Sequence, residues 1–436
     1  MSTEIIRKDL ERLLDRPFPH VNSLEKSGFG YVIESDDIVG LGLGRCNLTS
    51  FPKSILRVKN LRVLALNNNR LTNLPAEIRR LENLEILDLE KNVVSKLPPE
   101  LGQLPCLKTL NLSHNELTYL PSELECLERL EEIYLSSNSL ERVPNFLFQL
   151  NRLIHLDLNR NLIDSVPPNI NLLKRSKSLD LGGNRLTSLP SELGQLPHLE
   201  ILNLQGNQLI DLPLELGRLT KLKVLNLGDN QLTTLPSELG DLTCLRTLFL
   251  YANQLNTVPH ELGNLVNLEV LNLFANQLTD LPNEFGKLLK LKTLALQANQ
   301  LTSIPAELGQ LGQLKFLYLS NNRLQTLPKE IGQFSCLKTL TLGGNLLRKL
   351  PPELGDLRSL VTLDLCENQI TELPPELGHL TKLKHLDLEG NQISELPIEL
   401  ENLIKLRSLI LYDNPLMDIP SELNLLPIVI DKEPTR

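Results

Sequence analysis

Residues 61–75 read LRVLALNNNRLTNLP, with leucine at 61, 64, 66, 71 and 74 and asparagine at 69. The same pattern returns 23 residues later at 84–98 and continues without insertion to 406–420. Sixteen units keep the asparagine, and one earlier unit carries Cys46 in its place. Seventeen consecutive 23-residue units are therefore predicted over residues 38–425, because chance does not keep such a register. The asparagines are Asn69, Asn92, Asn115, Asn138, Asn161, Asn184, Asn207, Asn230, Asn253, Asn276, Asn299, Asn322, Asn345, Asn368, Asn391 and Asn414.

Each unit is predicted to begin with a short β-strand. Leu64 and Leu66 alternate with Val63, Ala65 and Asn67, which is the period of a strand whose leucines face inward. Parallel strands cannot be joined by tight hairpins, so each unit must return over the back before the next strand begins. The asparagine stands where the chain turns inward after the strand. Its side-chain amide can accept from and donate to buried backbone groups, so we expect a structural ladder beneath a concave parallel sheet.

The return segment has a signature of its own, as in LPSELGQL at 189–196. Proline suits the first position of a short helix, and Glu192 suits its positive end. Gly194 is predicted to supply the left-handed residue that ends the helix. One helical or 3-10 turn per unit is therefore expected on the convex side.

Residues 1–37 depart from the repeat and are predicted to form an N-terminal cap, because an uncovered first unit would expose core and sheet edge. A strand over 31–34 is expected to turn into the first repeat strand at 38–41. Before it, a helix that ends before Pro17 is predicted. The apolar residues on one face of this helix are Ile6, Leu10, Leu13 and Leu14.

Residues 426–436 are predicted to form a C-terminal cap and tail, with a final strand or lid over 426–431. This cap is short. Either a short peptide suffices, or the C-terminal edge meets a partner or a second copy of the chain; a monomer is favoured.

Composition limits the class of protein and its partners. The formal net charge of −9 argues against nucleic acid and anionic membranes as partners. No apolar run is long enough to cross a bilayer, and the charged first residues do not resemble a signal or transit peptide. The six cysteines lack the paired spacing of a disulfide framework or zinc site, which indicates reduced thiols in the cytoplasm. No cofactor and no metal are expected.

The units resemble the 23-residue class of leucine-rich repeats, and the Leu-Pro-x-Glu-Leu-Gly signature resembles that of the intracellular Ras-group proteins, which include the Ras–Raf scaffold. The resemblance covers about residues 38–425. It implies an α/β repeat solenoid, a right-handed horseshoe with a concave parallel β-sheet. It also implies cytoplasmic binding of signalling proteins, such as a small GTPase, phosphatase or kinase, on the concave face. No binding residue of the family can be matched here by motif.

Five aromatic residues are predicted to gather on outward positions of four neighbouring strands. They are Phe249, Tyr251, Phe274, Phe316 and Tyr318. Ala252, Ala275 and Ala298 are expected to line an adjacent row as a low apolar floor. Because binding hot spots are enriched in aromatic residues, the cluster is predicted to contact a partner. The alternative is that the rings only shield one another on the sheet face.

Acidic residues are predicted to follow this cluster on the last concave strands and turns. They are Asp364, Glu367, Asp387, Glu389 and Asp413, and a second acidic group, Asp88, Glu90, Asp157 and Asp180, lies toward the start of the chain. Such a surface would steer a basic partner toward the face. A solvated face that maintains solubility is the equal alternative.

One return segment breaks the pattern, because Phe146 and Phe148 replace the usual glutamate and glycine. Ser176 replaces a core leucine nearby, within a basic stretch at 174–177. The favoured interpretation is local repacking of the core; the alternative is a second docking site on the convex side.

An enzyme is not predicted. His155, Asp157 and Ser178 could lie close together, but an open sheet offers no evident oxyanion hole. A metal at Asp364, His385 and Asp387, near Cys366, has no supporting motif. Two functions stay open: a non-catalytic scaffold for signalling proteins, and a recognition module or effector that captures a peptide or host protein.

Overall fold

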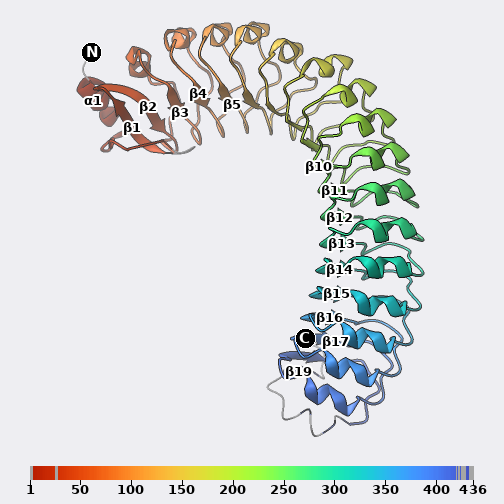
Figure 1. The fold of residues 1–436 in the computed structure, drawn as a ribbon. Helices are drawn as coiled ribbons and strands as arrows, with labels where there is room; N and C mark the ends of the chain where they lie inside the picture. The colour runs from red at the N-terminus through yellow and green to blue at the C-terminus, as the bar shows by residue number, and fades with distance from the viewer. Residues whose placement is uncertain (1–2, 25–27, 419, 421–422, 424–428, 432–436) are drawn as a thin grey trace. The chain divides into compact units, whose positions relative to one another are not determined.

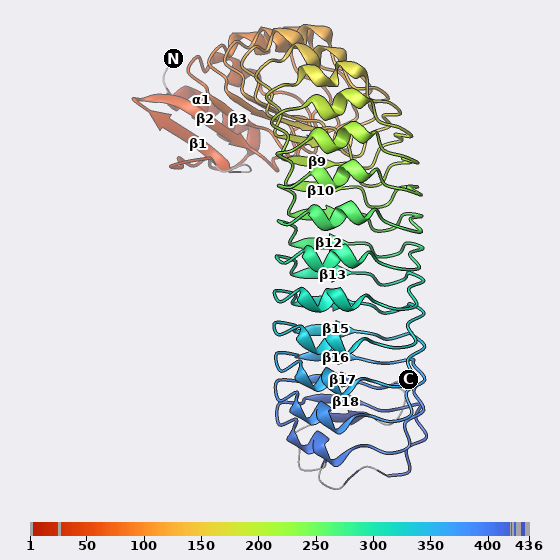
Figure 2. The ribbon, with the colours of Figure 1, turned by 45° about the vertical axis from the view of Figure 1, so that its right-hand side comes forward.

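The computed structural model describes residues 3–24, 28–418, 420, 423 and 429–431. The chain divides into two compact units, unit 1 over Met1–Gln208 and unit 2 over Leu209–Arg436. In each unit the strands form one layer and short 3-10 helices form the other (Figure 1). Figure 2 turns the view by 45° and brings the short 3-10 helices forward.

Unit 1 begins with helix α1 (Thr3–Leu14) and the antiparallel pair β1 (Phe29–Glu34) and β2 (Asp37–Leu43). From β2 onward each strand pairs in parallel with the next. The further strands are β3 (Val63–Ala65), β4 (Ile86–Asp88), β5 (Thr109–Asn111), β6 (Glu132–Tyr134), β7 (His155–Asp157), β8 (Ser178–Asp180) and β9 (Ile201–Asn203).

Unit 2 continues the same arrangement, with each strand parallel to the next. Its strands are β10 (Val224–Asn226), β11 (Thr247–Phe249), β12 (Val270–Asn272), β13 (Thr293–Ala295), β14 (Phe316–Tyr318), β15 (Thr339–Thr341), β16 (Thr362–Asp364), β17 (His385–Asp387), β18 (Ser408–Ile410) and β19 (Val429–Asp431). The predicted repeat solenoid, with a parallel sheet on one side and short turns on the other, is confirmed within each unit.

Register follows the sequence period, since Val63 lies opposite Ile86 and Ile86 lies opposite Thr109. The inward leucines, such as Leu64 and Leu66, are fully buried. We call the surface that carries the alternate, outward residues the sheet face. Because the leucines occupy the interior, the sheet face is free to vary.

Each return segment that the structure describes in full contains one 3-10 helix. In unit 1 these are η1 (Lys53–Arg57), η2 (Ala76–Arg80), η3 (Pro99–Gln103), η4 (Ser122–Cys126), η5 (Asn145–Gln149), η6 (Pro168–Leu172) and η7 (Ser191–Gln195). In unit 2 they are η8 (Leu214–Arg218), η9 (Ser237–Asp241), η10 (His260–Asn264), η11 (Asn283–Lys287), η12 (Ala306–Gln310), η13 (Lys329–Gln333), η14 (Pro352–Asp356), η15 (Pro375–His379) and η16 (Ile398–Asn402).

The predicted roles of proline and glycine in these segments were wrong in detail. Pro190 precedes η7 in an extended conformation, with φ −73° and ψ 145°, and its carbonyl accepts from the Leu193 N–H at 3.1 Å. Gly194 lies inside η7 rather than after it as a left-handed terminator. Gly240 is the equivalent residue of η9, and a Cβ there would come within 2.4 Å of the Glu261 carbonyl oxygen in the following repeat. Glycine at this position therefore allows η9 and η10 to stack closely.

The left-handed conformation occurs instead just before the ladder asparagine. Asn68 and Lys91 precede Asn69 and Asn92 and have φ of 55° and 54°. This turn redirects the chain from the strand into the interior.

The N-terminal cap covers the first strands of unit 1. Ile6 and Leu10 of α1 are buried, whereas Leu13 is 53% exposed, so the predicted apolar face is narrower than expected. Arg16 places an Nη2 atom 3.0 Å from the sulfur of Cys46, which occupies the ladder position of the first unit. At the other end β19 pairs with β18, and the rest of the predicted C-terminal cap (426–428 and 432–436) lies outside the described residues.

Candidate functional site

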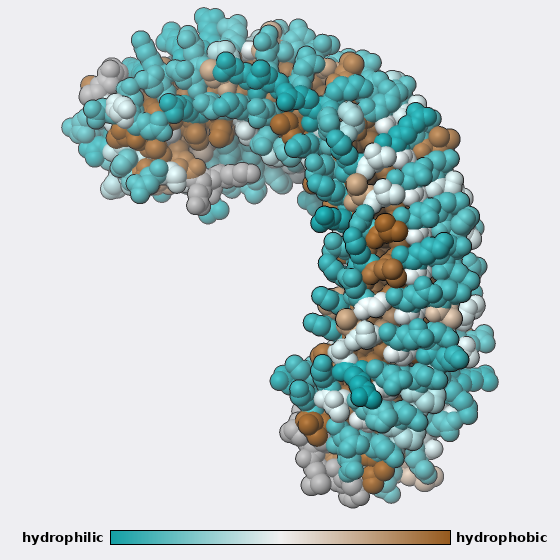
Figure 3. All heavy atoms as spheres, in the orientation of Figure 1, coloured by the Kyte–Doolittle hydropathy of each residue, from teal (hydrophilic) through white to brown (hydrophobic). Residues whose placement is uncertain are grey.

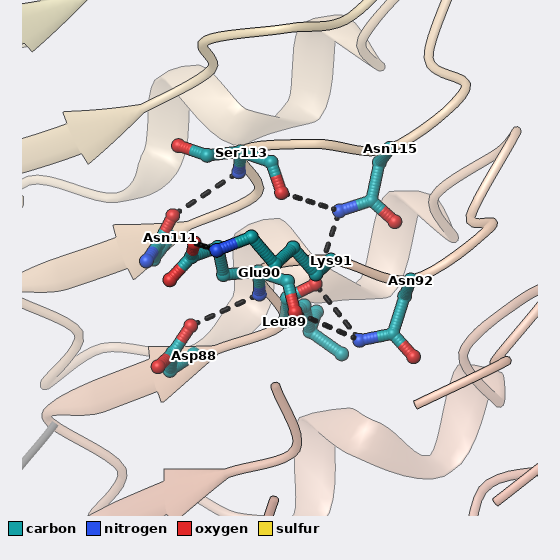
Figure 4. Close-up of polar contacts among 8 residues, drawn as sticks. All are labelled: Asp88, Leu89, Glu90, Lys91, Asn92, Asn111, Ser113 and Asn115. Atoms are coloured by element: carbon teal, nitrogen blue, oxygen red, sulfur yellow. Dashed lines mark hydrogen bonds and ion pairs between the residues drawn. The ribbon is translucent and has the colours of Figure 1, made fainter. Parts of the chain in front are cut away.

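The ladder asparagines hold the turns from which the sheet face is built. Asn92 donates through Nδ2 to the carbonyl oxygen of Leu66 at 3.0 Å and to that of Leu89 at 2.9 Å. Figure 4 shows the hydrogen bond to Leu89. Its Oδ1 accepts from the backbone N–H of Leu71 at 3.0 Å. In each of the sixteen repeats that carry the ladder asparagine, its Oδ1 atom accepts from the backbone N–H of the residue 21 positions earlier. These hydrogen bonds connect each repeat to the one before it, so the outward side chains are held on a fixed backbone.

Four of the five predicted aromatic residues form two pairs, each within one strand segment of unit 2. The Phe249 and Tyr251 rings meet edge to face with centroids 6.3 Å apart. The Phe316 and Tyr318 rings stack with centroids 6.4 Å apart. β12 and β13 lie between the two pairs. Phe274, which follows β12, is 43% exposed.

The Tyr251 ring lies against Gly228, which follows the neighbouring strand β10. A Cβ on Gly228 would come within 2.4 Å of the Tyr251 ring, so the ring covers that glycine. Burial raises the pKa of the Tyr251 hydroxyl, and the nearby Asp229 carboxylate adds to the increase. Tyr251 therefore has a packing role as well as an exposed edge, whereas Phe274 projects into solvent.

The alanines beside these rings occupy the left-handed turn position. Ala252, Ala275 and Ala298 have φ of 51°, 54° and 53° and are half-buried. Their short side chains leave a low surface between the rings, as expected for a floor.

Three of the residues around the predicted acidic surface converge. Asp364 and Asp387 are register partners on β16 and β17, and the Cys366 sulfur lies with one oxygen of each within 4.8 Å. The Cys366 N–H donates to Asp364 Oδ1 at 3.1 Å. His385 is paired with Thr362 at the start of β17 and is not part of this cluster. Glu367 and Asp413 are exposed on adjoining turns, and Glu389 is half-buried.

Crowding of negative groups changes the proton affinity of this cluster. Burial and the Asp364 carboxylate raise the pKa of the Cys366 thiol, which therefore keeps its proton at neutral pH. Burial also raises the pKa of Asp387, and the Asp364 and Glu389 carboxylates add to the increase.

The residues considered for catalysis do not form an oriented triad. His155 and Ser178 are register partners on β7 and β8. Asp157 accepts instead from the Asn159 N–H at 2.9 Å, and Ser136 also donates to it. Its carboxylate is thus engaged by groups other than the imidazole.

Phe146 and Phe148 are buried in η5. The rings fill the interior, which fits local repacking and removes the exposed apolar surface that a second docking site would need. Ser176 is also buried, and its hydroxyl lies 3.5 Å from the Ile154 carbonyl oxygen.

The structure also shows a pocket that the sequence did not predict, on the sheet face of unit 1. Its volume is about 360 Å³, and it spans β3 to β6 with Leu24 of the cap at its edge. The sequence placed the acidic residues Asp88 and Glu90 on this face, but it did not reveal the pocket, because Leu24 comes from outside the repeats.

Among the described residues, no helix is long and apolar enough to span a membrane.

Comparisons with known proteins agree with this architecture. A family model described as a leucine-rich repeat region matches residues 41–161, 168–280 and 260–344, and a second leucine rich repeat model matches 358–416. A leucine-rich-repeat protein of Leptospira interrogans is 35% identical, with a TM-score of 0.77 over 95% of this chain and 99% of that one. No curated protein sequence matches the chain.

Two other solved structures are similar. The plant peptide hormone receptor RGFR1, in complex with RGF2, is 28% identical, with a TM-score of 0.68 over 92% of this chain and 74% of that one. The functional domain of InlJ from Listeria monocytogenes is 23% identical, with a TM-score of 0.66 over 79% of this chain and 73% of that one, which bears on the fold alone.

Proposed function

Because this chain belongs to the leucine-rich-repeat family, whose members act as protein-interaction scaffolds, we propose that it binds a partner protein on the sheet face of unit 2. The observation that carries the proposal is the exposed ring of Phe274 between the Phe249–Tyr251 and Phe316–Tyr318 pairs. We call these five residues the aromatic patch.

The aromatic patch has the properties of a binding hot spot. Rings that are already packed in pairs lose little conformational entropy on binding, and the exposed edge of each ring offers apolar area. The half-buried alanines between them leave room for partner side chains. Phe274 adds exposed apolar area to that of the two neighbouring pairs, and a contiguous apolar surface is typical of a partner-binding site.

The acidic residues that follow on β16, β17 and the adjoining turns favour a partner with a basic surface. They attract such a surface at a distance and align it along the sheet face, at a rate that falls with ionic strength. The acidic residues therefore steer the partner toward the sheet face, and the aromatic patch makes the contact with it.

The partner that we favour is a cytoplasmic signalling protein, such as a small GTPase, phosphatase or kinase. All six cysteines are free thiols, which suits a reducing compartment. A second candidate is capture of a peptide, because the similar RGFR1 structure is a receptor in complex with RGF2. The scaffold itself would contribute no catalytic step.

The test is affinity capture from native cytosol with the wild-type chain and the Phe274→Ser/Tyr318→Ser double variant, followed by mass spectrometry. We expect at least one protein to be captured by the wild-type chain and not by the double variant. The melting temperature of the double variant should differ from that of the wild type by less than about 3 °C, because both side chains are partly exposed. Tyr119→Ser, which removes a ring that is 52% exposed elsewhere, is the matched control and should keep the partner. Retention of every partner by the double variant would refute the proposal. A large loss of stability would show instead that the rings are structural.

A further inference from the structure

The pocket of unit 1 has an apolar floor on a face that is otherwise mostly polar. Val63, Ala65 and Ile86 line it from β3 and β4, and Ile86 is 38% exposed. Figure 3 shows hydrophobic side chains gathered toward the N-terminal end of unit 1. About 360 Å³ is at the lower end of the range for ligand pockets, and it suits one or two side chains rather than a large cofactor.

A cap residue forms the wall of the pocket nearest to β2. Leu24 lies against β2 where the outward positions are Gly40 and Gly42. A Cβ on Gly40 would come within 2.9 Å of Leu24 Cδ1, and one on Gly42 within 2.7 Å of Leu24 Cδ2. Side chains at these two positions would displace Leu24. A Cβ on Gly42 would also meet the Gly28 carbonyl oxygen, so the two glycines make room beside β2 for the cap segments that carry Leu24 and Gly28.

The opposite wall is acidic. Asp88, Glu90 and Glu132 line the pocket, and none of the described residues that line it is a lysine or an arginine. Figure 4 shows Asp88 and Glu90 on consecutive outward positions, with Asp88 Oδ1 accepting from the Glu90 N–H at 3.0 Å. Lys91, which does not line the pocket, lies 2.9 Å from a Glu90 oxygen. His114 also lines the pocket, so one lysine and one histidine stand against three carboxylates.

Glu132 is held in place inside the pocket by two hydroxyl donors. The Tyr134 hydroxyl donates to Glu132 Oε2 at 3.1 Å, and Thr109 Oγ1 donates to the same oxygen at 3.4 Å. Burial and the Glu132 carboxylate raise the pKa of Tyr134 to about 12, so the phenol keeps its proton. A fixed carboxylate beside an apolar floor pairs best with a cation that arrives next to an apolar group.

We propose that this pocket binds an extended peptide segment in which an aliphatic side chain lies next to a lysine or arginine. The aliphatic group covers Val63 and Ile86, and the cation meets Glu90 and Glu132. Four strands at about 4.8 Å spacing extend roughly 14 Å, which is the length of about four residues of extended peptide. Acidic peptides and phosphate groups are repelled by the same carboxylates.

The experiment uses a fluorescein-labelled hexapeptide, Gly-Leu-Lys-Leu-Arg-Gly, titrated with the full chain and followed by anisotropy. Two further peptides carry glutamate in place of the cations or serine in place of the leucines. The site variant is Thr109→Arg, which places a cation in the pocket. Its matched control is Thr339→Arg, because Thr339 is the same position of the repeat on β15 of unit 2. The melting temperature of each variant is measured in parallel.

Saturable binding of the first peptide is expected, with at least tenfold weaker binding of either altered peptide. Thr109→Arg should weaken binding at least tenfold, whereas Thr339→Arg and the Phe274→Ser/Tyr318→Ser variant should leave it unchanged. The proposal is overturned if no peptide binds at millimolar protein, or if the glutamate peptide binds equally well. Equal loss in both arginine variants also overturns it, because the site would then not be this pocket. These outcomes are independent of whether unit 2 captures its own partner.

Discussion

The carboxylate of Asp387 is half-buried on the sheet face of unit 2, between two other acidic side chains. Its Oδ1 accepts from the Glu389 N–H at 3.1 Å, which stabilises the charged form. Burial and the Asp364 and Glu389 carboxylates act in the opposite direction and prevail, so the pKa of Asp387 lies above its ordinary value of 3.8. A carboxyl group with a raised pKa in the folded state destabilises the fold at higher pH. This penalty begins to fall once the pH drops below the folded-state pKa, and it is absent below the ordinary value.

Asp387→Asn is therefore expected to increase the free energy of unfolding at pH 7, by less than about 1 kcal/mol because solvent screens these groups. The asparagine Oδ1 can still accept from Glu389. The gain should shrink as the pH is lowered through the folded-state pKa, which urea denaturation at a series of pH values would measure. Asp413→Asn removes a charge at an exposed position and serves as the comparison. A gain that persists unchanged at low pH would contradict the electrostatic explanation.

At the scale of elements, η9 and η10 stack so closely that a side chain at Gly240 would not fit without a shift of the backbone. Gly240 lies in η9, and a Cβ there would come within 2.4 Å of the Glu261 carbonyl oxygen in η10. That oxygen belongs to the backbone, so it cannot turn aside as a flexible side chain would. By contrast, nothing lies within 4 Å of a Cβ on Gly312, in the loop after η12.

Gly240→Ala should accordingly destabilise the chain by about 1–3 kcal/mol, because neighbouring 3-10 helices must move apart. Gly312→Ala should be neutral or stabilising by up to about 1 kcal/mol, since alanine restricts the unfolded chain. Chemical denaturation of the two variants provides the comparison. Similar losses in both would show that backbone conformation, and not close stacking, explains the glycines.

The elements that depend on the 23-residue period could be predicted from the sequence. Strands, inward leucines and one 3-10 helix per unit follow from local alternation and from the crossover that parallel strands require. The predicted role of Gly194 was wrong, because a glycine after a helical segment usually adopts a left-handed conformation that ends the helix. Here glycine lies inside the 3-10 helix, where it allows successive repeats to stack closely. The left-handed position falls on varied residues such as Lys91 and Ala275, so composition did not reveal it.

The candidate sites were less predictable. Outward positions followed from the period, so the aromatic residues could be placed on neighbouring strands of unit 2. Their pairing within strands, and the lean of Tyr251 over Gly228, depend on side-chain packing that no pattern encodes. The pocket of unit 1 depends on Leu24, a cap residue that lies against strands belonging to the repeats.

At the scale of the whole molecule, all repeats have the same length and the same strand register, so one complete 23-residue repeat can be removed without breaking the pattern. Stability of a solenoid is close to a sum over units and their interfaces. Deleting residues 276–298 joins Ala275 to Asn299, and deleting 322–344 joins Asn321 to Asn345, each restoring the normal sequence of turn and ladder positions. Both deletions lie within unit 2 and remove one strand each, β13 and β15 respectively.

These deletions test whether the aromatic patch acts as one surface. Removing β13 brings the Phe316–Tyr318 pair one strand closer to Phe249–Tyr251, from three strand spacings to two, or from roughly 14 Å to 10 Å. A partner that contacts both pairs should then be lost in affinity capture. Removing β15 leaves the spacing unchanged and should preserve capture. Both proteins should show cooperative melting at similar temperatures. If the β13 deletion still captures the partner, each pair must bind separately, since the distance between them would no longer matter.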